Sequence, residues 1–360
     1  MKKSNQIFIF ILCVSLLIIQ VTAQTNSVND RANQNSINQK ILDKYEQSAV
    51  RIKRHWQLIN KTNGKQIYFL YVPVKTLKQK GIQMMSQAEA VPVYVENDSG
   101  SFEPVLVEDK GKYNVPVEDY VSAGGFDVTT DGFILTSRRV AAPWHSVKSY
   151  EGSTIPPGII LSADLKKIST VDSAPPVDWI PSHTKPQRGM IANLGIKADF
   201  NYENISNKIE IKVAFHKGNE LDAQLVSSSD QHEVGLIKVK IPGELKAPEL
   251  YDNYDLLKKD SADNFIVFTE KTGLTVMKIL VNKTYSDEMG NTIQLIDKFS
   301  GPKKETAEES RSFFTVFSNS SSGNPVFDSK GRVIGIYLGY NANNYTHNIV
   351  PIRFGKELLQ

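Results

Sequence analysis

The sequence predicts an all-β protein built from many short strands, and three observations support this fold class. Apolar, β-branched and aromatic residues come in short runs. Clusters of Gly, Pro, Asn and Asp separate these runs, as they do at turns between strands. No long segment has the 3.6-residue periodicity of an amphipathic helix. A chain of this pattern folds as a sandwich or as barrels.

The packed part of the chain is expected to start near residues 49–59, and residues 66–74 have the composition of a strand. Further strands are predicted at residues 91–96, 132–137, 209–215, 234–241, 264–270, 275–281, 313–317, 325–327 and 332–340. A short helix is predicted at residues 254–259. Because it contains several prolines, the stretch from Ser153 to Pro186 is expected to be a long surface excursion.

Composition excludes several classes of function. The 360 residues are 40% hydrophobic and 22% charged, an ordinary balance for a soluble globular protein. A net charge of +3 is too small to indicate nucleic acid or an anionic membrane as a partner. The only cysteine, Cys13, excludes a disulfide framework and a cysteine-based metal site. No two histidines have ligand spacing and no nucleotide-binding glycine motif is present, so we expect no metal and no cofactor.

The N-terminus has the features of a secretory signal peptide. Two lysines precede the apolar run at residues 7–19, and the small residues Val21 and Ala23 permit cleavage after Ala23. The alternative is an uncleaved membrane anchor, but the run is shorter than the ~20 residues that cross a bilayer. We therefore expect residues 1–23 to be removed and the mature protein to be secreted or periplasmic. Residues 24–44, polar and rich in asparagine, are predicted to be a linker.

Four segments resemble the HtrA (Deg) branch of trypsin-like serine proteases. The family's strand and turn before the catalytic histidine are similar to AGGFDVTTDGFILTSRRV, residues 123–140. The strand that carries the triad aspartate is similar to LVSSSDQHEVGLIKVKIP, residues 225–242. The most specific match is SSSGNPVFDSKGRVIGI, residues 320–336, which resembles the nucleophile segment. The closing NIVPIRFGKELL is similar to the strand and helix that end the protease domain.

This resemblance implies a fold of two packed six-stranded antiparallel β-barrels, with the active site between them. It covers residues 45–360, with the first barrel at about 45–242 and the second at about 243–360. No PDZ domain, which many relatives carry, is expected after Gln360.

The resemblance also implies where catalytic residues would stand. The histidine position is occupied by Arg139, the aspartate position by Glu233 and the nucleophile position by Ser322. The first two are 94 residues apart, unusually far for the family. Ser320 replaces the glycine whose amide helps to form the oxyanion hole, and Asn324 replaces a second glycine.

These replacements predict an inactive site. Arginine stays protonated, with a pKa above ~12, and offers no lone pair, so Arg139 cannot serve as the base. Glu233 keeps a carboxylate, and we expect it to form a hydrogen-bonded ion pair with Arg139. A serine at position 320 resists the backbone conformation that aims an oxyanion-hole amide. His145, six residues after Arg139, is the one histidine that is a candidate substitute base.

The function expected from the sequence is that of a secreted pseudoprotease that binds peptide or protein ligands between the barrels. One alternative is an active serine endopeptidase that uses Ser322 with an unconventional base. The other is an extracytoplasmic structural or interaction domain, in which Ser322 is an ordinary turn serine. The membrane would be a partner only if the N-terminal segment stayed uncleaved.

Overall fold

The computed structural model describes residues 40–41, 43–45, 48–84, 86–96, 102–145, 147–148, 157–162, 164–171, 178–179, 187–191, 194, 196–200, 202–215, 219–241, 243, 245–252, 264–270, 274–286, 293–297, 322–328, 330–341 and 346–360. The predicted signal peptide, the helix at 254–259, the strand at 313–317 and Ser320 lie outside these residues. Within them, no helix is long and apolar enough to cross a membrane.

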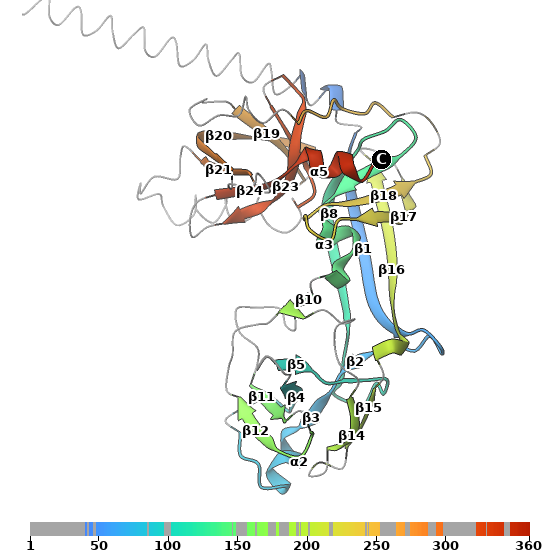
Figure 1. Cartoon of the computed structure of the whole chain (residues 1–360), viewed down its shortest axis with the longest axis vertical. Helices are drawn as coiled ribbons and strands as arrows, with labels where there is room; N and C mark the ends of the chain where they lie inside the picture. The colour runs from blue at the N-terminus through green and yellow to red at the C-terminus, as the bar shows by residue number, and fades with distance from the viewer. Residues whose placement is uncertain are drawn as a thin grey trace, which may run out of the picture.

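Six antiparallel strands close into a barrel in the first half of the fold (Figure 1). In order around the barrel these are β1 (Ala49–Asn60), β16 (Ile205–Phe215), β17 (Glu220–Ser228), β18 (Gly235–Val239), β9 (Phe133–Thr136) and β8 (Glu118–Asp127). Alternate residues of β1 point inward, and Ile52, Trp56 and Leu58 are buried. This alternation is the period-2 pattern expected of a strand with one face in the core.

Six further strands pair in a second closed ring: β19 (Asn264–Glu270), β20 (Leu274–Ser286), β21 (Ile293–Asp297), β24 (Thr346–Pro351), β23 (Val333–Asn341) and β22 (Pro325–Phe327). Helix α5 (Ile352–Glu357) follows β24. One apolar cluster joins the two rings, because Phe126 and Leu236 of the first pack with Phe327 and Ile336 of the second and with Phe354 of α5. The predicted all-β fold class is therefore confirmed.

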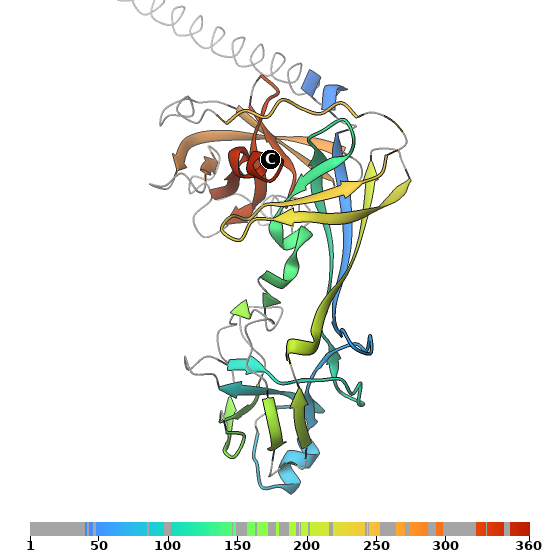
Figure 2. The same ribbon diagram turned by 45° about the vertical axis from the view of Figure 1, so that its right-hand side comes forward.

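The two insertions into the first barrel form a separate lobe. The chain leaves the barrel after β1 and returns at β8, then leaves again after Ala141 and returns at β16. Figures 1 and 2 show this lobe at the far end of the long strands β1, β8 and β16. Its elements are β2 (Tyr68–Phe69), β3 (Tyr71–Pro73), α2 (Val74–Gln79), β4 (Ala90–Glu96), β5 (Phe102–Pro104), β6 (Leu106–Val107), β7 (Val115–Pro116), β10 (Val147–Lys148), β11 (Gly158–Leu161), β12 (Ile168–Val171), β13 (Asp178–Trp179), β14 (Gln187–Ile191) and β15 (Ile196–Phe200).

The lobe has an apolar core of its own, which includes Val72, Leu77, Val93, Ile159 and Leu161. The second insertion explains the long separation between Arg139 and Glu233, because it lies between α3 (Arg138–Ala141) and β16. The lobe is thus additional to the two closed rings.

The structure corrects two sequence predictions in this lobe. The stretch from Ser153 to Pro186 is not a surface excursion throughout, because β11 lies inside it and Ile159 is fully buried. β11 pairs in parallel with β4 and is therefore a strand of the lobe's sheet, and its residues Ile159 and Leu161 belong to the lobe's apolar core. The prediction of a single strand at residues 66–74 is also wrong. Leu70 separates two short strands, β2 and β3, and helix α2 begins at Val74.

Packing also begins earlier than expected. Ile41, within the segment predicted to be a linker, is 5% exposed and belongs to the cluster that joins the two rings. Residues 40, 41 and 43–45 are helical, and Tyr45 stacks on Phe327 with ring centroids 5.4 Å apart. The domain therefore includes residues from at least Ile41 onward.

Candidate functional site

Strand β9 leads into the turn that carries the predicted base position. Ser137 follows β9 and precedes the four-residue helix α3 (Arg138–Ala141). The helix packs directly on β18, because a Cβ at Gly235 would lie 2.4 Å from the Cβ of Ala141. The C-terminal half of α3 is buried in the first-barrel core. Arg139 is consequently the exposed residue of this short helix.

The predicted pair between Arg139 and Glu233 is present. Oε1 of Glu233 accepts a hydrogen bond from Nε of Arg139 at 3.3 Å and another from its backbone N–H at 2.8 Å. The Arg139 side chain is 56% exposed and that of Glu233 is 20% exposed. Both bonds end on one oxygen, so Arg139 does not make the two parallel side-chain bonds of an ideal arginine–carboxylate pair.

A second arginine occupies the other oxygen of Glu233. Nη2 of Arg138 lies 3.2 Å from Oε2, and the Arg138 side chain is 19% exposed. Nη1 of Arg138 donates to the carbonyl oxygens of Ser229 at 3.2 Å and Asp230 at 2.9 Å. The carboxylate of Glu233 is therefore held by two guanidinium groups, and the three charges leave a net charge of +1.

A third arginine fixes α3 from behind. Arg54 of β1 is 3% exposed, and its Nη2 donates to Oδ2 of Asp119 at 2.8 Å and to the carbonyl oxygen of Arg139 at 3.3 Å. Burial lowers the pKa of Arg54, while attraction and hydrogen bonding by Asp119 oppose this shift. Arg54 thus ties the backbone of α3 to β1 and β8.

Ser322 reaches the same turn from the second ring. Its Oγ donates to Oγ of Ser137 at 3.1 Å, although the two residues are 185 positions apart, and Ser322 is only 3% exposed. The backbone N–H of Gly124 donates to the carbonyl oxygen of Ser322 at 2.8 Å. Gly323 has a φ of +93°, and a Cβ there would lie 2.2 Å from the Gly124 carbonyl oxygen, so glycine is required.

Asn324 has a packing role that accounts for its presence at a family glycine position. It is 5% exposed, and a Cβ at Gly124 would lie 1.9 Å from Oδ1 of Asn324. The missing side chain of Gly124 therefore makes room for the amide. Through this contact β8 of the first barrel and the start of β22 interlock beside Ser322.

The candidate substitute base has a different neighbour. His145 ends the short 3₁₀ helix η1 (Pro143–His145), and its Nε2 lies 3.4 Å from Oγ of Ser228. His232 stacks on Phe354 of α5, with ring centroids 3.4 Å apart, so it contacts a different element from the adjacent Glu233. Among the described residues, Ser137 is the hydrogen-bond partner of the Ser322 hydroxyl.

This arrangement supplies no proton acceptor for Ser322 within the described residues. Both carboxylate oxygens of Glu233 accept from arginines. Neither arginine has a lone pair to offer, and a serine hydroxyl such as that of Ser137 is not a base at neutral pH. The sequence analysis did not single out Ser137, Arg138 or Arg54. The signals available for them were the adjacent arginine pair in the turn and an arginine at an inward-facing position of β1.

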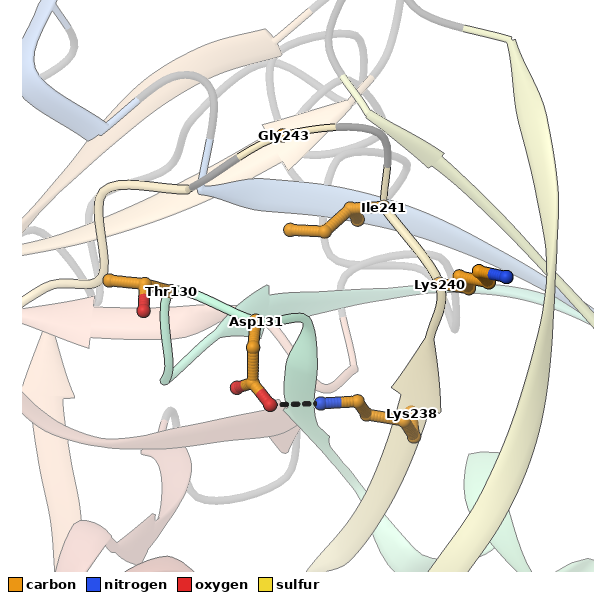
Figure 3. A pocket seen from close by; sticks show the side chains of 6 residues that line it. All are labelled: Thr130, Asp131, Lys238, Lys240, Ile241 and Gly243. Carbon is orange, nitrogen blue, oxygen red and sulfur yellow. Dashed lines mark hydrogen bonds and ion pairs between the residues drawn. The ribbon is translucent and has the colours of Figure 1, made fainter.

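A hollow lies at the other end of β18. It has a volume of about 410 Å³ and is lined by Thr130, Asp131, Lys238, Lys240, Ile241 and Gly243, and Figure 3 shows Lys238 pointing to Asp131, 2.5 Å away. It lies at the end of β18 opposite to Gly235 and α3. No group of three or more histidine, cysteine, aspartate or glutamate side chains in the described part of the chain is arranged to hold a metal ion.

Comparison with known proteins gives likenesses of structure but none of sequence. No family model and no curated protein sequence matches the chain. Among solved structures, the fold is similar to "HtrA-type protease AlgWS227A with decapeptide", with 12% identity and a TM-score of 0.46. The match covers 90% of this chain and 65% of that protease, so the chain spans about two thirds of its length. The base-position turn and the nucleophile-position segment belong to two different closed rings and are in contact, as the resemblance of the sequence implies.

Proposed function

We propose that this protein is a pseudoprotease: a trypsin-like fold that binds an extended peptide between its barrels and does not cleave it. The observation that carries the proposal is that two arginines pair with Glu233. One of them, Arg139, stands at the position of the triad base. The burial of Ser322 and its bond to Ser137 support the same reading, because a nucleophile must be reachable and next to a base.

The experiment that tests inactivity compares purified wild type with Ser322→Ala. Both are incubated with unfolded casein and with a serine-directed fluorophosphonate probe. We expect no cleavage and no labelling above the level of Ser322→Ala. Because loss of the base in a serine protease costs on the order of 10⁶ in turnover, overnight incubation separates the outcomes. Cleavage by wild type that disappears in Ser322→Ala would show an active enzyme, and His145→Ala would then test the substitute base.

The binding half of the proposal is tested separately. Wild type is mixed with a degenerate decapeptide pool that carries a photo-crosslinking side chain, and the crosslinked positions are identified by mass spectrometry, with Tyr120, which is 65% exposed, as the comparison position for Arg139. We expect crosslinks at position 139 and few at position 120. Failure to crosslink at either position would contradict peptide binding.

A second candidate function is that of an interaction domain, and the inserted lobe with its own core favours it. Under this reading ligands bind the lobe, and crosslinks form from lobe positions but not from position 139. We also propose export of the protein, which rests on the signal-peptide features of residues 1–23. Sequencing the N-terminus of secreted material, with Gln24 as the expected first residue, tests it.

A further inference from the structure

The two arginines on Glu233 use their donors differently. Arg138 binds the carboxylate through Nη2 and two backbone carbonyl oxygens through Nη1, so both of its terminal nitrogens are engaged. Arg139 binds the carboxylate only through Nε and its backbone N–H. No hydrogen bond or ion pair joins Nη1 or Nη2 of Arg139 to another side chain or carbonyl in the described residues. The terminal edge of this guanidinium is therefore unoccupied there.

That free edge is held in place before any ligand arrives. Glu233 fixes the guanidinium at Nε, and Arg54 holds the backbone carbonyl of the same residue. An arginine whose orientation is already set loses less side-chain entropy on binding a partner than a free one. Its two terminal nitrogens, Nη1 and Nη2, form the fork of donors that matches the two oxygens of a carboxylate.

The local charge also favours an acidic partner. Two guanidinium groups share one carboxylate: Oε1 of Glu233 accepts hydrogen bonds from Arg139, and Oε2 forms an ion pair with Arg138. The three side chains together have one excess positive charge. Arg139, with a 56% exposed side chain, is the more exposed of the two arginines. The Arg54–Asp119 pair behind α3 is itself balanced.

The position of this charge is at the junction of the two rings. Ser137, two residues before Arg139, contacts Ser322 of the second ring. We propose, on the basis of the function proposed above, that Arg139 determines specificity by binding a carboxylate of the peptide ligand, so that the protein selects acidic peptides. The former base position thus becomes a recognition site for a negative charge.

The test uses three pools of fluorescein-labelled degenerate decapeptides and fluorescence polarisation. One pool has a central glutamate and an amidated C-terminus. The second has a central glutamine and is amidated. The third has a central glutamine and a free C-terminus, which distinguishes a terminal carboxylate from a side-chain carboxylate. Tighter binding of the first or third pool than of the second, by about 10-fold at low salt, is expected for a bidentate charge-assisted contact.

Two variants and one control assign the preference to Arg139. Arg139→Gln should bind all pools with the affinity that wild type has for the second pool. Arg139→Lys, which keeps the charge but not the fork, should retain only a several-fold preference. The control Lys240→Gln removes one positive charge at the exposed Lys240, which lines the hollow at the other end of β18, and should leave the preference unchanged.

Each outcome decides between the two proposals. Equal binding of all three pools by wild type would overturn the carboxylate site but leave peptide binding intact. Binding of none of the pools would overturn both. A preference that persists in Arg139→Gln, or that Lys240→Gln abolishes equally, would also overturn the role of Arg139. Should Arg139→Gln fail to fold, the pool comparison on wild type and the Arg139→Lys measurement still decide.

Discussion

In a histidine–aspartate couple the histidine takes up and returns the proton of the nucleophile, whereas an arginine–glutamate couple holds its charges permanently. In this protein the couple is Arg139 and Glu233, and Arg138 joins it on the second carboxylate oxygen. The exposure of the three side chains differs, from 19% for Arg138 to 56% for Arg139. The Glu233 carboxylate pairs with both arginines. Removing it therefore breaks two ion pairs, whereas removing either arginine breaks one.

This asymmetry predicts the effect of two substitutions on stability. Arg139→Ala should cost less than about 1 kcal/mol, because the lost ion pair is largely solvated and Arg138 still binds Glu233. Removing one partner of a fully buried pair would instead cost ~3–5 kcal/mol. Glu233→Ala should cost about 1–3 kcal/mol, because it leaves two guanidinium groups without their acceptor. Urea unfolding of both variants checks this, and a larger loss for Arg139→Ala than for Glu233→Ala would contradict it.

Asp127 at the end of β8 carries a second prediction at this scale. It is fully buried and its backbone N–H donates to the carbonyl oxygen of Ser48, while neither carboxylate oxygen has a hydrogen-bond partner among the described residues. Burial therefore raises the pKa of Asp127 to about 7. Because the folded pKa is above the unfolded one, the folded state binds more protons. The contribution of Asp127 to the free energy of unfolding is fully present below about pH 4. It is lost as the pH rises through about 7, by roughly 4 kcal/mol in all.

The variant Asp127→Asn should remove this pH dependence. It should be more stable than wild type at pH 8 and similar at pH 4, as measured by urea unfolding at both values. A wild-type protein whose stability does not fall between these pH values would show that Asp127 is ionised in the folded state at low cost.

At the scale of elements, the short helix α3 is held by packing and by Arg54 in addition to its few backbone hydrogen bonds. It has four residues and no side-chain N-cap bond at Ser137. Its close approach to β18 depends on Gly235. Because Arg139 is part of α3, this contact between helix and strand also determines where the free guanidinium edge lies.

Gly235→Ala should therefore destabilise the fold by about 1–3 kcal/mol, since the new methyl would lie 2.4 Å from the Cβ of Ala141 and one element must move. It should also weaken the preference for acidic peptides. Gly243→Ala is the matched control, because no atom lies within 4 Å of a Cβ there. Equal melting temperatures for the two variants would mean that α3 is not packed on β18 as described.

At the scale of the whole molecule, the barrels and the lobe have separate apolar cores. Leu77 and Val93 belong to the lobe core, whereas Phe126 and Phe327 belong to the cluster that joins the two rings. The long strands β1, β8 and β16 connect the two parts (Figure 2). Cooperative units often coincide with such separately packed parts of a structure.

Leu77→Ala, at a fully buried lobe position, should thus cost 2–5 kcal/mol within the lobe and little elsewhere. In hydrogen exchange, protection should fall for residues 66–117 and 157–171 and stay unchanged for residues 322–360. Peptide binding at Arg139 should survive. Loss of protection throughout the chain would show that lobe and barrels unfold as one unit.

The sequence by itself determined the all-β class, most of the barrel strands, and the pairing of Arg139 with Glu233. These follow from local composition and period, and from segments that keep their order along the chain. It did not determine that Ser322 is buried against Ser137, that Arg138 takes half of Glu233, or that β11 is the interior of a second core. Those features depend on contacts between residues separated by tens to hundreds of positions, as with the 185 between Ser137 and Ser322. Only the tertiary structure brings such residues together, because a local pattern fixes which face a side chain lies on but not what lies opposite to it.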